Sequence, residues 1–102
     1  MKADYDSEAD AILIEIEEVD HWDRGVTVDD ADFCEVAFLD DRPVGVSLRY
    51  PREEIRLLRR ASERFGLDAT ALEATTQAAL AAPDRIVTVD VNPRVLAGSA
   101  AA

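Results

Sequence analysis

The stretch VGVSLRYPREEIRLLRRASERFG, residues 44–66, contains a change of hydrophobic period in the middle of the chain. Up to Tyr50, apolar residues alternate with small or polar ones, which is typical of a strand with one buried face. Beyond Pro51, which suits the first turn of a helix, apolar residues recur every three or four positions, and Gly66 is a suitable C-terminal stop. The stretch therefore predicts a strand that leads directly into a helix.

The segments on the N-terminal side of this stretch show further strand patterns. Alternation of apolar and polar residues predicts strands in AILIEIE (11–17), GVTVD (25–29) and FCEVAFLD (33–40). The polar connection DDRP (40–43) has the length and composition of a hairpin. We therefore expect a mainly antiparallel β-meander of about five strands in the first half of the chain.

The C-terminal half predicts a second helix and a last strand. Asp68 is a suitable N-cap for the alanine-rich segment ATALEATTQAALAA (69–82), and RIVTVDV (85–91) again alternates. The expected fold class is α+β, with the meander and the C-terminal strand in one sheet and two helices packed on one of its faces. We expect a single domain over residues 1–91 and a C-terminal tail over residues 92–102.

Charge is distributed unevenly along the chain. The 102 residues include 22 acids and 11 Lys plus Arg, a net charge of −11. Residues 1–41 carry a net charge of −13, whereas residues 49–64 carry +3. Such a surface repels phosphate backbones and anionic membranes, so nucleic acid is an unlikely partner. No apolar run reaches the roughly 18 residues that a membrane span needs.

Cysteine usage indicates a compartment. Cys34 is the only cysteine, so no internal disulfide can form, and the reducing cytoplasm is the expected location. Within its strand pattern the thiol shares a face with Val36 and Phe38, so we expect it to pack as a small apolar residue.

An acidic cluster near the N-terminus is the first candidate for chemistry; its members are Asp4, Asp6, Glu8 and Asp10. Alternating acids bind a hard cation when their oxygens converge, but here no glycine follows and the chain runs directly into a strand. We favour a turn in which Asp6 accepts a backbone N–H. The sequence predicts no metal site and no cofactor.

The only histidine is the second candidate. His21 lies between Asp20 and Asp23, an arrangement in which a carboxylate can hold an imidazole as general base. No nucleophile elbow accompanies it, so a polar loop residue is the preferred interpretation. We expect no catalytic residues, and the alternative is a small cation-dependent or His/Asp-based enzyme.

Arginines of the first predicted helix are the third candidate. They recur at every fourth position, which places like charges on one helix face. Either the acidic half of the chain offsets this charge, or the row binds an anion or an acidic protein surface, since Arg pairs well with carboxylates. Trp22 is either a lid on the core or an exposed interface anchor. The candidate interaction residues are Arg49, Arg52, Arg56, Arg60, Arg64 and Trp22.

Residues 4–50 also carry a family resemblance. Tyr5-Asp6, two spacers, Ala9-Asp10 and an apolar strand are followed by Asp40-Asp41 and Val44-Gly45. This pattern resembles the short uncharacterised bacterial proteins grouped as domain of unknown function 2283. The resemblance implies a small β-meander with a packed helix and no reaction, and some relatives occur beside small toxin-like genes.

These features favour a non-catalytic protein-interaction module that self-associates, as a homodimer. The charge separation along the chain and the lack of a catalytic constellation are the reasons. A further alternative is an antitoxin-like protein whose acidic face covers a basic RNA-binding protein, which makes a basic protein a second expected partner.

Overall fold

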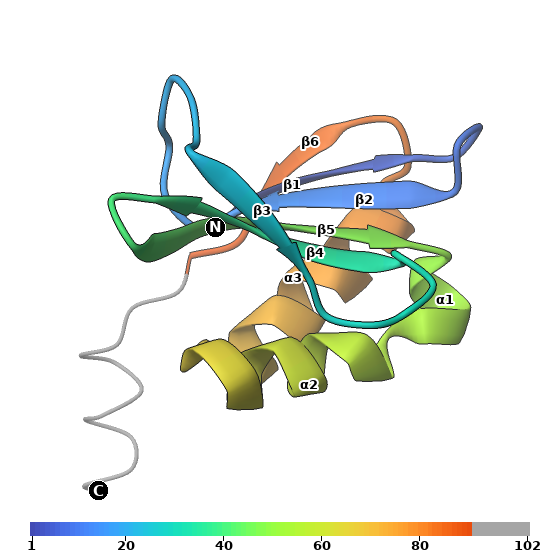
Figure 1. The fold of residues 1–102 in the computed structure, drawn as a ribbon. Coiled ribbons are helices and arrows are strands. Elements are labelled where there is room, and N and C mark those ends of the chain that lie inside the picture. The colour runs from blue at the N-terminus through green and yellow to red at the C-terminus, as the bar shows by residue number, and fades with distance from the viewer. Residues whose placement is uncertain (91–102) are drawn as a thin grey trace, which may run out of the picture.

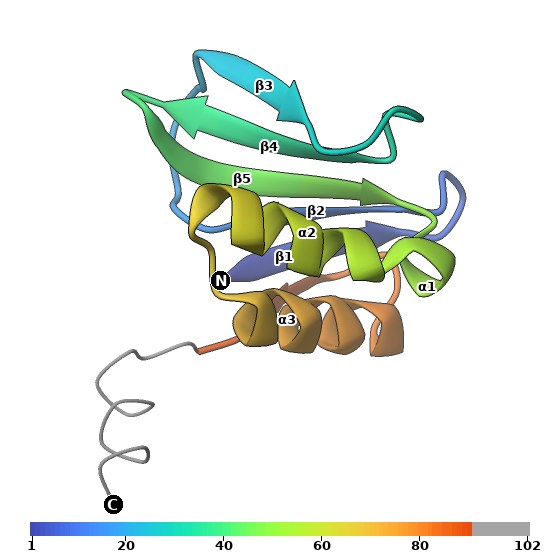
Figure 2. The ribbon, with the colours of Figure 1, turned by 60° about the horizontal axis from the view of Figure 1, so that its bottom comes forward.

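A computed structural model of the chain describes residues 1–90 and contains one antiparallel sheet with helices on one face (Figures 1 and 2). The strands are β1 (Lys2–Asp6), β2 (Ala11–Glu15), β3 (Arg24–Thr27), β4 (Cys34–Leu39), β5 (Arg42–Arg49) and β6 (Ile86–Thr88). The helices are α1 (Pro51–Glu54), α2 (Arg56–Phe65) and α3 (Ala69–Ala81). The expected α+β class is confirmed. The predicted tail, 92–102, lies outside the described residues.

Strand order departs from a simple meander. The order is β3-β4-β5-β2-β1-β6, so β2 pairs with β1 and β5, and the loop 16–23 leads to β3 at the far edge. Pairing places Ile12 opposite Leu48 and Ile14 opposite Val46, which forms a continuous apolar strip facing the helices. The short β3 (RGVT) has no comparable pair of apolar residues, so β5 is the better neighbour for β2.

Strand β1 comes from a segment for which the sequence predicted only an acidic turn. Ala3 and Tyr5 are buried and point to the helices, whereas Lys2, Asp4 and Asp6 point the other way. The alternation is present in the sequence, but two apolar residues among acids are a weak signal.

The predicted turn follows directly after β1. Asp6 Oδ1 accepts hydrogen bonds from the backbone N–H groups of Glu8 (3.0 Å) and Ala9 (3.1 Å), as expected. Asp10 has a positive φ of 52°, and its carboxylate accepts a hydrogen bond from the Tyr5 hydroxyl at 2.7 Å. The acidic cluster therefore shapes the β1–β2 hairpin.

Helix boundaries follow the expected signals, with one break. Pro51 is in the first turn of α1, Gly66 ends α2 with a φ of 70°, and the Asp68 side chain caps α3 through the Ala71 N–H. The single helix predicted from Pro51 is divided at Ile55 into α1 and α2. Within residues 1–90, no helix is both long and apolar enough to cross a membrane.

The hydrophobic core lies between the sheet and the helices. Its fully buried side chains come from both layers, and Cys34 packs among them as predicted. The largest are Ile12, Ile14, Val36, Val46, Leu48, Leu57, Leu58 and Leu72. All of them lie on the helix side of the sheet, so the largest buried side chains within residues 1–90 come from that side.

The β4–β5 hairpin is stabilised less than its geometry allows. Asp40 and Asp41 occupy its two central positions with φ of 51° and 64°, a left-handed pair that favours Asn-Gly. We expect Asp40→Asn combined with Asp41→Gly to raise the free energy of unfolding by about 1 kcal/mol, measured by urea denaturation. The control pair Asp30→Asn and Glu63→Gln removes the same charge elsewhere, and an equal gain there would show that charge alone is responsible.

Candidate functional site

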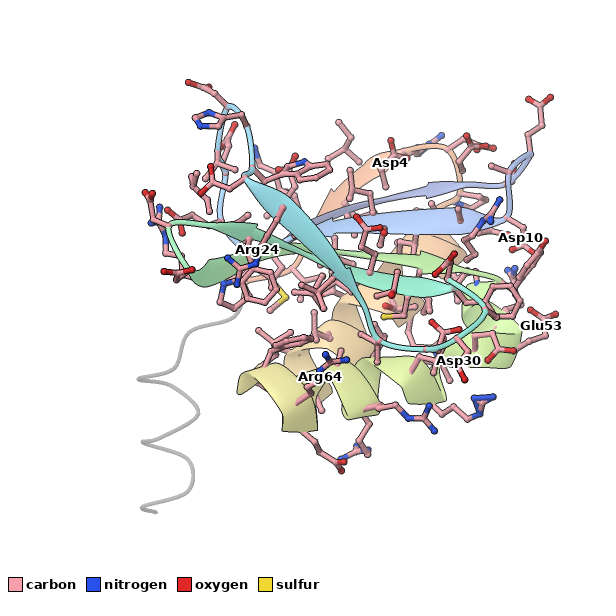
Figure 3. The ribbon with its side chains drawn as sticks, viewed as in Figure 1. Asp4, Asp10, Arg24, Asp30, Glu53 and Arg64 are labelled. Atoms are coloured by element: carbon pink, nitrogen blue, oxygen red, sulfur yellow. The ribbon has the colours of Figure 1, made fainter. Side chains whose placement is uncertain are left out.

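The face of the sheet that points away from the helices is uncovered within residues 1–90 (Figures 1 and 2). Leu13 and Ile86 lie on this face and are 53% and 72% exposed. Asp4, which is labelled in Figure 3, lies between them, because it is the register partner of both. Large apolar side chains and an acid therefore form a row across β6, β1 and β2.

A hollow of about 270 Å³ lies beside this row. Leu13 and Ile86 supply its apolar wall, and its charged lining residues are Lys2, Asp4, Glu15 and Glu18. The Lys2 ammonium lies 3.4 Å from the Glu18 carboxylate, so the single base of the lining already has a partner. The remaining charge of the hollow is negative.

A second hollow, of about 90 Å³, lies on the other side of β2. Ala37 and Gly45 contribute to its lining from β4 and β5, and Val19 and Trp22 contribute from the loop 16–23. A side chain at position 45 would approach the Ile14 carbonyl oxygen to 3.3 Å, which favours glycine there. Trp22 is 55% exposed, so it lines the hollow without being absorbed into the core.

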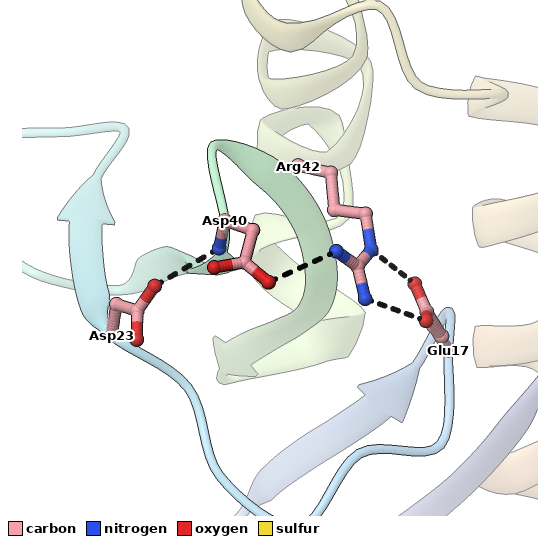
Figure 4. A network of polar contacts seen from close by, with 4 residues as sticks. All are labelled: Glu17, Asp23, Asp40 and Arg42. Atoms are coloured by element: carbon pink, nitrogen blue, oxygen red, sulfur yellow. Dashed lines mark hydrogen bonds and ion pairs between the residues drawn. The ribbon is translucent and has the colours of Figure 1, made fainter.

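A polar network attaches both ends of the Trp22 loop to the β4–β5 turn (Figure 4). Arg42 donates two hydrogen bonds to the Glu17 carboxylate, from Nε at 2.8 Å and Nη2 at 2.9 Å, and lies 3.5 Å from Asp40. Asp23 Oδ2 accepts a hydrogen bond from the Asp40 backbone N–H at 2.9 Å. The loop is thus held at its beginning and its end, which orients Trp22 over the sheet.

The charges of this network reinforce each other. Hydrogen bonds from Arg42 lower the pKa of Glu17, and Glu17 in turn raises the pKa of Arg42. Both side chains are nearly half exposed, so solvent weakens the pair and it contributes more to position than to stability.

The predicted arginine row is divided between different surroundings. Arg52 lies over the Tyr5 ring at 5.5 Å and donates to its hydroxyl at 3.3 Å, since the break at Ile55 separates it from α2. Arg56 pairs with Glu54 at 3.1 Å. Arg60 is exposed and has no ionic partner among residues 1–90. Arg56, Arg60 and Arg64 therefore remain together on α2, in the layer opposite the uncovered face.

Arg64 and Arg49 complete the predicted set. Arg64 Nη1 donates to the Thr27 carbonyl oxygen at 3.3 Å, and Figure 3 shows it between α2 and the sheet. Arg49 is exposed at the end of β5, away from α2. Of the six predicted interaction residues, only Trp22 lines a hollow of the uncovered face.

The candidates for catalysis are dispersed. His21 is exposed in the loop 16–23, and no group of three His, Cys, Asp or Glu side chains within the described part of the chain is arranged to hold a metal ion. Several carboxylates cap backbone N–H groups instead, such as Asp29, which accepts from Cys34 (2.9 Å) and Phe33 (3.2 Å). Burial opposes ionisation of Asp29, but these backbone bonds outweigh it and lower its pKa.

The predicted interaction set did not include Leu13 and Ile86, although both carry a sequence signal. Each is an apolar residue on the polar side of an alternating strand: Leu13 shares its side with Glu15, and Ile86 shares its side with Thr88. Such a residue indicates either a sheet covered on both faces or an apolar surface patch.

Comparisons with known proteins give no family for this chain. No protein-family model, no curated protein and no solved structure matches it, so the resemblance over residues 4–50 stays a prediction.

Proposed function

We propose that this protein is a non-catalytic interaction module that self-associates as a homodimer through the outer edge of β6. The observation that carries the proposal is this edge, where Ile86 is 72% exposed. No strand within residues 1–90 pairs with the side of β6 that points away from β1. The lone buried thiol of Cys34 is compatible with the reducing cytoplasm as its compartment.

Hydrogen bonding supports the edge as a pairing site. Met1 and Val89 exchange two backbone hydrogen bonds of 2.8 Å across β1 and β6. The backbone N–H and C=O groups of successive residues in an antiparallel strand point alternately toward and away from the neighbouring strand. Because those of Val89 point toward β1, the groups of Ile86 and Thr88 point away from it. Unpaired groups of this kind are a template for another strand.

The opposite edge of the sheet is less available. Val28 N–H donates to the Cys34 carbonyl oxygen, so the backbone groups of Thr27 point outward from β3. The Thr27 carbonyl oxygen already accepts from Arg64. Within the part of the chain that the structure describes, β6 therefore retains more unsatisfied outward backbone groups than β3.

Charge also favours a symmetric contact at β6. Two copies with a net charge of −11 each repel one another unless the contact avoids the acidic regions. Between Arg85 and Val89 there is one base and no acid. Antiparallel pairing of β6 with its copy brings together apolar and neutral side chains and extends the sheet across the dimer.

Replacement of Thr88 by proline tests the proposal. We expect the wild-type protein to sediment as a dimer at high micromolar concentration and Thr88→Pro to sediment as a monomer, because proline removes an outward N–H without removing a bond to β1. Sedimentation velocity measures the change. Thr88→Ala keeps the N–H and should remain a dimer.

Two results would contradict the proposal. A wild-type monomer at high micromolar concentration would remove self-association altogether. A dimer that persists in Thr88→Pro but dissociates in high salt would place the contact between the α2 arginines and the acidic regions of another copy, since ionic contacts are screened by salt and backbone pairing is much less so.

A further inference from the structure

The uncovered face combines apolar hollows with an acidic rim. Asp4, Glu15 and Glu18 surround the larger hollow, and Glu17 lines the smaller one. Lys2 is the only base in the two linings, and Glu18 already pairs with it. An occupant of this face therefore has to bring apolar side chains together with positive charge.

A second copy of this chain is a poor occupant. Face-to-face packing of two copies sets the acids of one rim against the acids of the other. The basic surface of α2 lacks an apolar anchor, because its exposed positions are Arg56, Arg59, Arg60, Glu63 and Arg64. The apolar residues Leu57 and Leu58 are buried against the sheet.

Spacing of the hollows indicates the shape of the occupant. They lie on either side of β2, over β1 and β5, and neighbouring strands are about 4.8 Å apart, so their centres are roughly 10 Å apart. Two residues seven positions apart in an α-helix are separated by about 10.5 Å on one face. An extended segment offers about 7 or 14 Å instead.

We propose that this face binds a cationic amphipathic helix of a partner protein. Two apolar side chains of the helix, seven residues apart, fill the hollows on either side of Leu13, and its Lys or Arg residues contact the rim at Asp4 and Glu15. Trp22 lines the smaller hollow from its anchored loop. Because the loop is already held in place, little ordering opposes binding.

Trp22 is the only tryptophan, so its fluorescence reports on the site. The probe is a synthetic helical peptide without tryptophan, with leucines seven residues apart and lysines between them. We expect titration with this peptide to shift the Trp22 emission to shorter wavelength and to reduce quenching by acrylamide, because the indole loses its exposure to water. A peptide of the same composition with its leucines on different faces should bind about tenfold more weakly.

Variants of the protein separate the apolar and charged contributions. Leu13→Ala should weaken binding of the probe about tenfold at any salt concentration. The pair Asp4→Asn and Glu15→Gln should weaken binding of the probe about fivefold at low salt and much less at high salt. The matched pair Asp30→Asn and Glu63→Gln removes the same charge from exposed positions away from the hollows and should change affinity less than about twofold.

Three outcomes would overturn the proposal. The first is a Trp22 emission that does not change on addition of the probe. The second is a probe with glutamates in place of lysines that binds as tightly as the lysine probe. The third is a control pair that weakens binding as much as the rim variants do, which would mean that only the overall charge of the protein attracts the probe.

The probe is also titrated against Thr88→Pro, where its affinity should match the wild type. If the wild-type protein sediments as a dimer but does not bind the probe, only the proposal of helix binding is refuted. A wild-type monomer that binds the probe refutes only self-association.

Discussion

Leu58→Ala is expected to lower the free energy of unfolding by roughly 2–5 kcal/mol, the range for a fully buried leucine. Leu58 is 0% exposed and belongs, from α2, to the core cluster that side chains of the sheet and of α3 also form. Removing its isobutyl group leaves a cavity that the packed layers fill only partly, so lost contacts add to the lost burial. Since small domains unfold at a cost of about 5–15 kcal/mol, the variant should approach the limit of folding.

Urea denaturation followed by circular dichroism measures this loss. Leu13→Ala is the matched control, because it makes the same chemical change on the uncovered face, where the side chain is 53% exposed. The control should lose less than about 1 kcal/mol. Equal losses in the two variants would mean that the core does not lie between the sheet and the helices.

The Cys34 thiol is expected to react with a disulfide reagent at least about a thousandfold more slowly in the native protein than in denaturant. Burial, with a contribution from the Asp29 carboxylate, raises its pKa from 9.0 to about 12, so about a thousandfold less thiolate is present at pH 8. The 0% exposure of the residue adds a steric barrier. Reagent absorbance measured with and without denaturant gives the ratio.

The same pKa shift has a consequence for stability at high pH. Between pH 9 and 12 the unfolded thiol loses its proton while the folded thiol keeps it, so the free energy of unfolding falls as pH rises through this window. Cys34→Ala, which has no thiol to titrate, should lose less stability over the same window. An equal loss in both proteins would contradict the assigned pKa.

Leu58→Ala connects the two predictions. A buried thiol reacts when the structure opens, so labelling of Cys34 should accelerate in proportion to the increased open population. Rapid labelling of the wild-type protein at its denatured rate would place Cys34 outside the core.

Most of the local structure was predictable from particular residues. Pro51, Gly66 and Asp68 mark helix ends because each acts on backbone groups one to four residues away. The hairpin at Asp40-Asp41 and the Asx turn at Asp6 are local in the same sense. Strand β1 and the break at Ile55 were missed because their signals are weak beside the acidic and helical patterns that surround them.

The candidate site was predicted only in part. The sequence left Trp22 as either a lid on the core or an exposed interface anchor, and the structure places it beside a hollow with 55% of its surface exposed. The four arginines of the predicted helix were expected to share one face, but Arg52 turns to Tyr5 and only Arg56, Arg60 and Arg64 stay together on α2. Leu13 and Ile86 were absent from the predicted set, since a single apolar residue on a polar side does not reveal whether anything covers it.

The amino-acid sequence by itself determined which residues form strands and helices and which sides of them are apolar, because periodicity and capping depend on near neighbours. Only the tertiary structure decided that β5 lies beside β2 and that nothing within residues 1–90 covers one face of the sheet with a second layer. That choice brings Leu13, Trp22 and Ile86 onto one surface. Strand pairing depends on which of several distant segments packs best beside a given strand. A local sequence pattern does not contain that information, because the contacts join residues that are far apart in the chain.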